Sequence, residues 1–456
     1  MFTNKLKKIK PLSTTQIIML SFLMAILVGS LILWLPISSK SGVSVSYIDA
    51  LFTATTATCV TGLVTLPTVS TWSTFGQVVI LILIQIGGLG IITVLSGITV
   101  AMNRKFKLKD SRLISDAFNI GSLDGLSKFV KKVILGTFAV EGIGAILYMT
   151  VFIPQFGVKG IWISVFNSVS AFCNAGIDII AENSLCSYAT NPIINIVTSI
   201  LIILGGLGYI VWWDVLRVIG SFRRQKLKCF RHLTLHSKIV LSITAILIFG
   251  GALLIFVFEY SNLKTIGDMS IFDKIQVSLF QSVTTRTAGF ATVSQESLTD
   301  TTAIISLLLM FIGGSPVGTA GGIKTVTIAV LVFTAYAVIT NKNEISVFNR
   351  SLSREVTRKA VAISVMSFSI ALISTVLLSA VTDAPTLDVL YETVSATATV
   401  GLTRNLTPFL DLWGKIIIIC TMYLGRIGPI SLAIAFSYSK KESNIIKNPT
   451  EEISVG

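Results

Sequence analysis

Charged residues are scarce in this sequence. They make up 13% of the 456 residues, whereas 52% are hydrophobic, and soluble globular domains contain about 25% charged residues. The composition argues against an ordinary soluble domain and is typical of a protein that lies in a membrane. Cysteine is also rare, and its spacing predicts neither a zinc site nor a disulfide framework. The five positions are Cys59, Cys173, Cys186, Cys229 and Cys420.

Histidine and the common catalytic and nucleotide-binding motifs are nearly absent. The two histidines, His232 and His236, fall in a basic loop, where a solvated loop or helix end explains them better than a metal site. No "GxxxxGK[ST]", "HExxH" or "CxxC" pattern occurs, so phosphate and zinc sites have little support. The apolar runs contain no histidine and no paired carboxylates, which argues against an intramembrane enzyme.

Long apolar runs are what the sequence does contain. The runs "TTQIIMLSFLMAILVGSLILWLPI" (14–37) and "IVLSITAILIFGGALLIFVF" (239–258) reach the roughly 20 residues needed to cross a bilayer. The first run is too long for the apolar part of a signal peptide, so we expect it to be the first membrane helix.

Basic residues lie between the apolar runs. In a soluble protein the net charge of +14 would suggest nucleic acid, but 27 of the 36 Lys and Arg fall in five clusters. These clusters are the start of the chain, 104–132, 217–238, 342–359 and the tail from Lys440. The positive-inside rule places them, and with them both termini, in the cytoplasm.

A fourfold repeat organises the chain. Four stretches contain Ala together with Ser or Thr and end near a glycine: "LFTATTATCVTGL" (51–63), "VFNSVSAFCNAGI" (165–177), "LFQSVTTRTAGF" (279–290) and "LYETVSATATVGL" (390–402). The four glycines, Gly62, Gly176, Gly289 and Gly401, are separated by 114, 113 and 112 residues. A second glycine motif follows each one after about 25 residues. The second motifs are "QIGGLGI", "ILGGLGYI", "FIGGSPVGTAGG" and "YLGRIGPI".

The number of membrane crossings in each repeat can be inferred from the side of the membrane on which the basic loops lie. Three crossings per repeat would alternate the basic loops between the two sides, whereas two crossings keep them all in the cytoplasm. We therefore predict an all-α membrane protein of four tandem repeats, with eight transmembrane helices and four re-entrant P-loops around one central pore. The expected boundaries are a start at 1–13, repeats at 14–103, 129–217, 237–340 and 359–439, linkers at 104–128, 218–236 and 341–358, and a tail at 440–456.

The four re-entrant segments predict an ion filter. Irregular backbone survives at membrane depth only where protein covers it or a watery cavity adjoins it. Half-helices that direct their C-terminal ends at one axis favour a cation there, and inward carbonyls are the design of a potassium filter. Close packing of small residues between helices explains "GGLG" as well, but it does not explain the short re-entrant segments. The expected potassium ligands are the segments Cys59, Val60, Thr61, Gly62; Cys173, Asn174, Ala175, Gly176; Thr287, Ala288, Gly289; and Thr399, Val400, Gly401.

These motifs together resemble the Trk/Ktr/HKT superfamily of potassium transporters, and within it the KtrB-type membrane subunit. The resemblance covers residues 15–440 and rests on "TATCVTGL", "AFCNAGID", "TTRTAGF", "ATATVGLT", "GGSPVGTAGGIKT" (313–325) and "GRIGP" (425–429). It implies potassium uptake across the plasma (inner) membrane by a multi-pass protein, and a glycine at all four filter positions is similar to potassium-preferring members.

The resemblance also implies partners. It implies a homodimer in which each subunit has its own pore, gated by a cytoplasmic ring of KtrA-like subunits that would carry the ATP or ADP site. The basic loops and the tail then serve either as docking surface for that ring or only as topology signals that contact lipid headgroups. Sodium is left open as an activator, and a sodium-coupled or sodium/potassium carrier with alternating access is the alternative function, although such carriers usually have inverted or paired repeats.

A gate is predicted in the third repeat. The tract "GGSPVGTAGGIKT" cannot form a continuous helix, so we expect an intramembrane loop below the filter, with Gly313, Gly314, Gly318, Gly321 and Gly322 as hinges and Ser315 and Thr319 as polar contacts. By resemblance, Arg426 faces the pore near this loop. It would oppose potassium and hold the loop through its donors; the alternative is that it only binds backbone carbonyls at a helix break. Lys324 lies either at the cavity mouth or outward toward the headgroups.

Arg286 is the remaining charge close to a predicted filter strand. A cation at the C-terminal end of a pore helix is favoured by the helix carbonyls. We expect Arg286 to support the filter from behind, through backbone oxygens or a carboxylate such as Glu392 in the next repeat. In this position the arginine would point away from the pore, because inside it the cation would repel the ion.

Overall fold

The computed structural model describes residues 14–90, 126–220, 226–342 and 344–428, together with single positions between 93 and 99. The predicted start at 1–13, the tail at 440–456 and all but the last three residues of the linker at 104–128 lie outside the described residues.

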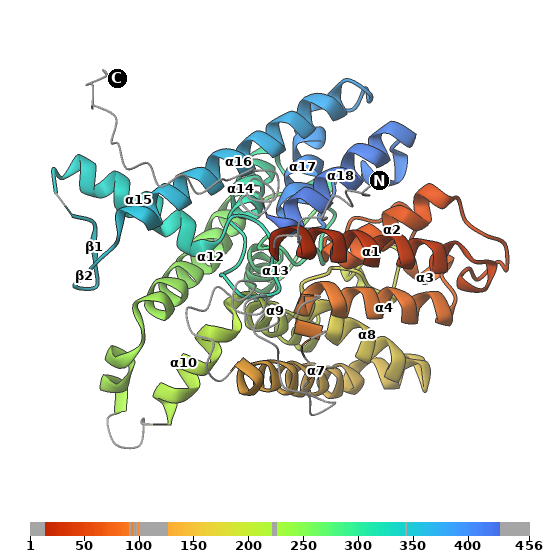
Figure 1. The fold of residues 1–456 in the computed structure, drawn as a ribbon. Helices are drawn as coiled ribbons and strands as arrows, with labels where there is room; N and C mark the ends of the chain where they lie inside the picture. The colour runs from red at the N-terminus through yellow and green to blue at the C-terminus, as the bar shows by residue number, and fades with distance from the viewer. Residues whose placement is uncertain are drawn as a thin grey trace, which may run out of the picture.

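Four similar units of three helices make up the fold (Figure 1). Each unit has a long helix, a half-helix of 13 to 15 residues and a second helix of 12 to 16 residues. A half-helix spans only about 20 Å at 1.5 Å per residue. The units are α1 (Thr14–Trp34), α2 (Tyr47–Cys59) and α4 (Thr74–Leu89); α7 (Leu126–Phe156), α8 (Lys159–Cys173) and α9 (Pro192–Leu207); α12 (Leu235–Glu259), α13 (Ile271–Thr284) and α14 (Asp300–Phe311); and α16 (Arg354–Ser379), α17 (Thr386–Ala398) and α18 (Leu412–Ile427).

Shorter elements connect or extend the units. Helix α10 continues unit 2 beyond α9, helix α15 continues unit 3 beyond α14, and a two-stranded hairpin links α15 to α16. Their bounds are α3 (Thr68–Thr71), α10 (Tyr209–Ile219), α15 (Thr325–Ile339), β1 (Ser346–Val347) and β2 (Arg350–Ser351), with 3-10 turns η1 (Pro36–Ser38), η2 (Cys186–Tyr188), η3 (Lys226–His232), η4 (Gln295–Ser297) and η5 (Thr407–Phe409).

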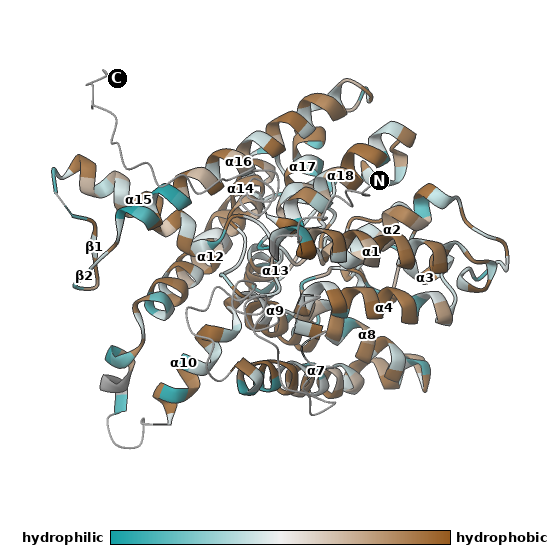
Figure 2. Cartoon of the chain, in the orientation of Figure 1, coloured by the Kyte–Doolittle hydropathy of each residue, from teal (hydrophilic) through white to brown (hydrophobic). Residues whose placement is uncertain are grey.

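The long helices are the clearest membrane spans. Among the described residues, α1, α7, α12 and α16 are long and apolar enough to cross a bilayer, and the bent pair α9 and α10 would be a fifth. Figure 2 shows their apolar surfaces, while hydrophilic residues gather around the end of α10 and near β1 and β2. The second helices α4, α9 and α18 are shorter because a glycine of positive φ follows each of them, at Gly90, Gly208 and Gly428. Since these helices do not reach the length of a membrane span, eight crossings stay a prediction.

The units close into a ring. Helix α4 packs on α8, α9 on α13, α14 on α17, and α18 returns to α2 of the first unit. A polar bond crosses each seam. These bonds are Trp162 Nε1 to Gln77 Oε1 (2.9 Å), the Ala291 N–H to Ser184 Oγ (3.3 Å), Tyr391 OH to Gln295 Oε1 (3.0 Å), and the ion pair of Lys415 with Asp49 (2.7 Å).

Candidate functional site

The predicted filter segments follow the four half-helices directly. Cys59 and Cys173 are still helical, as the last residues of α2 and α8, and the other predicted filter residues lie in the irregular backbone that follows. The residue that opens each filter tripeptide has a left-handed backbone, which is uncommon outside glycine. The φ values are 55° at Val60, 59° at Asn174, 69° at Thr287 and 51° at Thr399.

The four predicted glycines meet one another. Their φ values are +100°, +64°, +84° and +94° in chain order, a region that glycine adopts without strain. A methyl group on Gly62 would lie 2.6 Å from the Ala175 carbonyl oxygen, and one on Gly289 would lie 2.6 Å from that of Val400. Each glycine contacts the next strand, and Gly401 returns to the strand of Gly62, so the four strands form a closed ring.

The backbone of this ring alternates in the sign of φ. In each tripeptide the first residue and the glycine have positive φ, while the middle residue has a negative φ. Alternation of this kind turns successive peptide groups to the same side, as it does for N–H groups in an anion-binding nest. A carbonyl-lined cation filter needs its carbonyls on one side of each strand, so the alternation is compatible with the predicted filter, which stays a prediction.

Hydroxyl groups of the half-helices hold the strands, a feature that the sequence analysis did not identify. Thr56 Oγ1 accepts the Gly62 N–H at 2.9 Å and Ser395 Oγ accepts the Gly401 N–H at 3.0 Å. In the other two units the hydroxyl donates instead, from Ser170 to the Ile177 carbonyl (2.5 Å) and from Thr284 to the Phe290 carbonyl (2.6 Å). The Ser and Thr content of the half-helices was the available signal.

Arg286 and Glu392 do not contact each other. Arg286 follows the end of α13 and is 6% exposed, and its Nε has no hydrogen-bond partner. The Glu392 carboxylate instead accepts the hydroxyls of Thr403 (2.6 Å) and Thr407 within its own unit. The predicted carboxylate brace is therefore not formed with Glu392, and the support of the filter by Arg286 stays a prediction.

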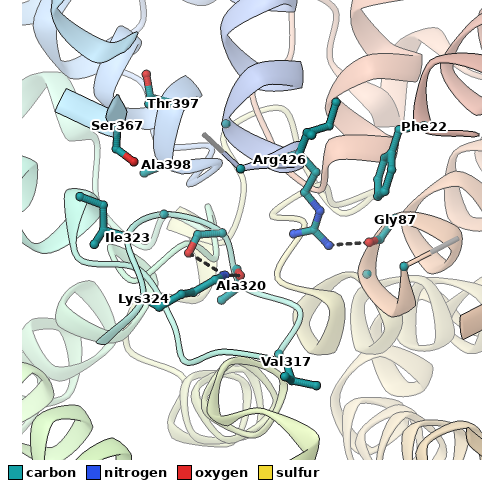
Figure 3. Close-up of a pocket in the computed structure, with 18 of the residues that line it drawn as sticks. Phe22, Gly87, Val317, Ala320, Ile323, Lys324, Ser367, Thr397, Ala398 and Arg426 are labelled. Atoms are coloured by element: carbon teal, nitrogen blue, oxygen red, sulfur yellow. Dashed lines mark hydrogen bonds between the residues drawn. The ribbon is translucent and has the colours of Figure 1, made fainter. Parts of the chain in front are cut away.

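A cavity of about 420 Å³ lies between α1, α4, α18 and the loop of unit 3 (Figure 3). Thr397 and Ala398, the last two residues of α17, line it next to the filter strand that begins at Thr399. Two cations, Lys324 and Arg426, also line it, and no acidic residue does so among the described residues. The charged side chains that line this cavity within the described residues are therefore all basic.

The segment between α14 and α15 is an irregular loop, as the tract "GGSPVGTAGGIKT" predicts. It returns on itself, because the Gly313 N–H donates to the Ile323 carbonyl (3.0 Å) and the Ile323 N–H donates to the Phe311 carbonyl (3.2 Å). It also rests on the bend between α9 and α10, where the two helices turn by 102°.

Backbone bonds and glycines fix the loop on this bend. The N–H groups of Ser315 and Thr319 donate to the carbonyls of Gly206 (2.8 Å) and Gly205 (3.1 Å), and the Tyr209 N–H donates to the Val317 carbonyl (3.2 Å). The predicted hinge glycines permit close backbone contact. Gly313 and Gly322 face each other, Gly314 and Gly318 lie against the Gly206 backbone, and Gly321 lies against Thr399.

Arg426 ties this loop to the first unit. Its guanidinium donates to the Thr319 carbonyl at 2.6 Å. It also donates to the Gly87 carbonyl, the bond that is drawn in Figure 3. In the repeat, Arg426 occupies the position of Gly88, Gly206 and Gly314. Lys324 lies inward and not toward the headgroups, because its Nζ donates to the carbonyls of Ala320 (2.6 Å) and Gly321 (3.4 Å).

A buried carboxylate in α7 is a second feature that the sequence analysis missed. Glu141 is 4% exposed and accepts Gln85 Nε2 at 3.1 and 3.3 Å. The Cys173 thiol, next to the second filter strand, lies 3.8 Å away. A single acidic residue within the apolar run 129–153 was a signal for a functional site.

Comparisons with known proteins agree with this arrangement. Residues 3–447 match the family model TrkH, described as "Cation transport protein". The chain is 39% identical over 442 residues to "Ktr system potassium uptake protein B" of Bacillus subtilis, covering 97% of this chain and 96% of the relative. It is 37% identical over 454 residues to "Potassium/sodium uptake protein NtpJ" of Enterococcus hirae, covering 98% of each.

A solved structure supports the same fold. The crystal structure of the potassium transporter TrkH from Vibrio parahaemolyticus superposes with a TM-score of 0.75 over 96% of this chain and 87% of that chain, at 17% identity. That identity supports the fold alone, whereas the family model covers nearly the whole length. The chain therefore belongs to the TrkH family of cation transport proteins, a family of multi-pass membrane proteins and not a class of enzymes.

Proposed function

We propose that this chain is the ion-translocating subunit of a Ktr-type potassium uptake system in the plasma (inner) membrane. The observation that carries the proposal is the closed ring of four glycine strands at the ends of four half-helices. A carbonyl-lined ring replaces the hydration shell of a monovalent cation. The names of the Bacillus subtilis and Enterococcus hirae relatives support potassium as the transported ion.

The proposed topology has eight membrane crossings and four re-entrant P-loops. The half-helices are too short to cross about 30 Å of hydrocarbon. If each enters and leaves from the outer side, every basic linker and both termini lie in the cytoplasm, in accord with the positive-inside rule. Potassium would then move inward, drawn by about 2.3 kcal/mol per 100 mV of membrane potential.

The proposed gate is the loop at 312–324 with Arg426. In the observed arrangement Arg426 joins the loop to the first unit, and the guanidinium and the Lys324 ammonium both face the cavity. Movement of the loop away from Arg426 would open the path. Homodimers and a KtrA-like cytoplasmic ring that carries ATP or ADP belong to this proposal, because the related sequences are named as parts of a Ktr system.

Sodium coupling is the alternative function. It is favoured by the relative named "Potassium/sodium uptake protein NtpJ". A channel would carry potassium without sodium, whereas a coupled carrier would need sodium on the same side of the membrane.

Reconstituted vesicles distinguish these functions. Purified protein in liposomes with an inward rubidium gradient should accumulate rubidium without sodium. An absolute requirement for sodium would favour the carrier, and no uptake by correctly inserted protein, with and without its regulatory subunit, would contradict the proposal. Gly62→Ser should weaken the preference for rubidium over sodium, because the added side chain would meet the Ala175 carbonyl across the ring.

A further inference from the structure

Thr319 connects the loop to the second filter strand. It is 1% exposed, and its side-chain Oγ1 lies 3.1 Å from the Phe172 carbonyl oxygen and 3.2 Å from Asn174 Oδ1. Its backbone N–H donates to the Gly205 carbonyl, while its own carbonyl accepts Arg426. Thr319 therefore contacts the bend between α9 and α10, Arg426 and the second filter strand.

Asn174 has a special position in the ring. It opens the second filter tripeptide, where the other three units have Val60, Thr287 and Thr399. Its amide nitrogen Nδ2 is buried and has no hydrogen-bond partner, so the contact of its Oδ1 with Thr319 is the side-chain hydrogen bond recorded for it in the described structure. Phe172 lies at the end of α8, where the carbonyls lack helical partners. The single proton of the Thr319 hydroxyl is shared between the Phe172 carbonyl and Asn174 Oδ1, so one hydroxyl contacts both the end of the half-helix and the start of its strand.

We propose that Thr319 is a positioning residue that couples the gate to ion selectivity. With the loop in place, its hydroxyl holds the second filter strand. When the loop leaves Arg426, the hydroxyl leaves Phe172 and Asn174 as well, and the strand loses this support. Selectivity between potassium and sodium then depends on the state of the gate. The inference rests on the proposed function and extends it to the regulation of the filter.

The loop geometry supports coupling in one direct step. The backbone carbonyl of Thr319 accepts Arg426 and its side chain contacts the filter strand, so no intervening residue is needed between the gate and the filter. Close approach is possible because Gly205 faces Phe172. A methyl group on Gly205 would lie 2.7 Å from Thr319 Oγ1 and 2.8 Å from Asn174 Oδ1.

The test compares Thr319→Val with Thr319→Ser in the background of the intact chain and of Arg426→Gln. The ratio of rubidium affinity to sodium affinity is measured by calorimetry for each purified variant without the regulatory subunit, because uptake would report only the state in which the loop has left the filter strand. Thr319→Val should lower the ratio about threefold or more in the intact background, whereas Thr319→Ser keeps the hydroxyl and should keep the ratio. In the Arg426→Gln background, where the loop is already released, Thr319→Val should lower the ratio no further.

Three outcomes would overturn the coupling between the gate and ion selectivity. An unchanged ratio in a folded, rubidium-conducting Thr319→Val protein would overturn the coupling, and so would an equal loss in both backgrounds. Thr334→Val is the matched control, because its hydroxyl donates within α15 to the Val330 carbonyl (2.7 Å) and should leave the ratio unchanged. If Thr319→Val fails to fold, loss of the ratio in Thr319→Ser overturns the proposal. Failure of the intact chain to conduct rubidium would instead contradict the proposed function.

Discussion

Replacement of Arg426 by glutamine should open the path through this protein. The arginine makes two hydrogen bonds from one charged group, to the Thr319 and Gly87 carbonyls, and glutamine is too short and has too few donors to span both. Hydrogen bonds to charged groups contribute about 1.5–3 kcal/mol each. The loss of both, with partial replacement by water, should weaken the closed state by about 2–4 kcal/mol.

This weakening predicts a large change in flux. Each 1.4 kcal/mol corresponds to a tenfold change in an equilibrium, so the ratio of open to closed protein should rise roughly 30- to 700-fold. Flux rises in proportion until the open state dominates. The removal of a positive charge from the cavity acts in the same direction. The assay is initial rubidium uptake per reconstituted protein, without the regulatory subunit, after size-exclusion chromatography has shown equal folding.

One control and one further variant separate the hydrogen bonds of Arg426 from its charge. Arg350→Gln removes an exposed arginine of β2 and should leave uptake at the wild-type rate. Arg426→Lys keeps the charge but cannot reproduce the two-carbonyl geometry, so it should release the loop while it still opposes the cation, with uptake between the wild-type and Arg426→Gln rates. Uptake by Arg426→Gln within twofold of wild type would refute the role of Arg426 in holding the loop closed. Uptake by Arg426→Lys equal to wild type would show that charge alone closes the path.

Three other predictions follow from the ring and its supports. Gly289→Ala should abolish selective uptake or folding, because φ is +84° and the new methyl would lie 2.6 Å from a carbonyl oxygen of the next strand; rubidium uptake and detergent stability measure this, and a selective, stable variant would contradict it. Lys415→Met should lower the thermal unfolding temperature by leaving the Asp49 carboxylate without its cation at the seam of the first and last units, whereas Lys415→Met with Asp49→Leu should recover most of the loss. Glu141→Ala should destabilise by about 2–4 kcal/mol, since it leaves a cavity and unpaired donors; an unchanged melting curve would exclude a structural role for the carboxylate.

The repeat and its glycines could be predicted from the sequence because a backbone conformation that requires glycine places a glycine at the same position in every unit. Glycine is needed where φ is positive and neighbouring strands touch, and both conditions recur in every unit at Gly62 and its equivalents. The break of the third unit was predictable for the same reason. A tract such as "GGSPVGTAGG" excludes a continuous helix whatever surrounds it.

The partners of buried charged groups could not be predicted in this way. Glu392 was expected to face Arg286, yet it binds two hydroxyls that follow in its own unit, because a chain turn brings Thr403 and Thr407 closer than the neighbouring unit. The hydrogen bond of Glu141 with Gln85 joins two units that are far apart in sequence. Composition and periodicity do not indicate which side chain of another unit will lie next to a buried charged group.

In the proposed function, Arg426 gives a fourfold repeat a single gate. Three units have glycine at the equivalent position, at Gly88, Gly206 and Gly314. At two of these positions a side chain would not fit, because a methyl group would lie 2.5 Å from the Cys173 sulfur at Gly88 and 2.4 Å from the Ala320 Cβ at Gly314. If all four units had arginine, four cations would crowd one cavity and repel each other and the transported ion. One arginine opposite a loop from one unit gives a contact that a small movement can break. In the proposed function, the asymmetry of the fourth and third units turns a symmetric ring into a pathway that can be closed.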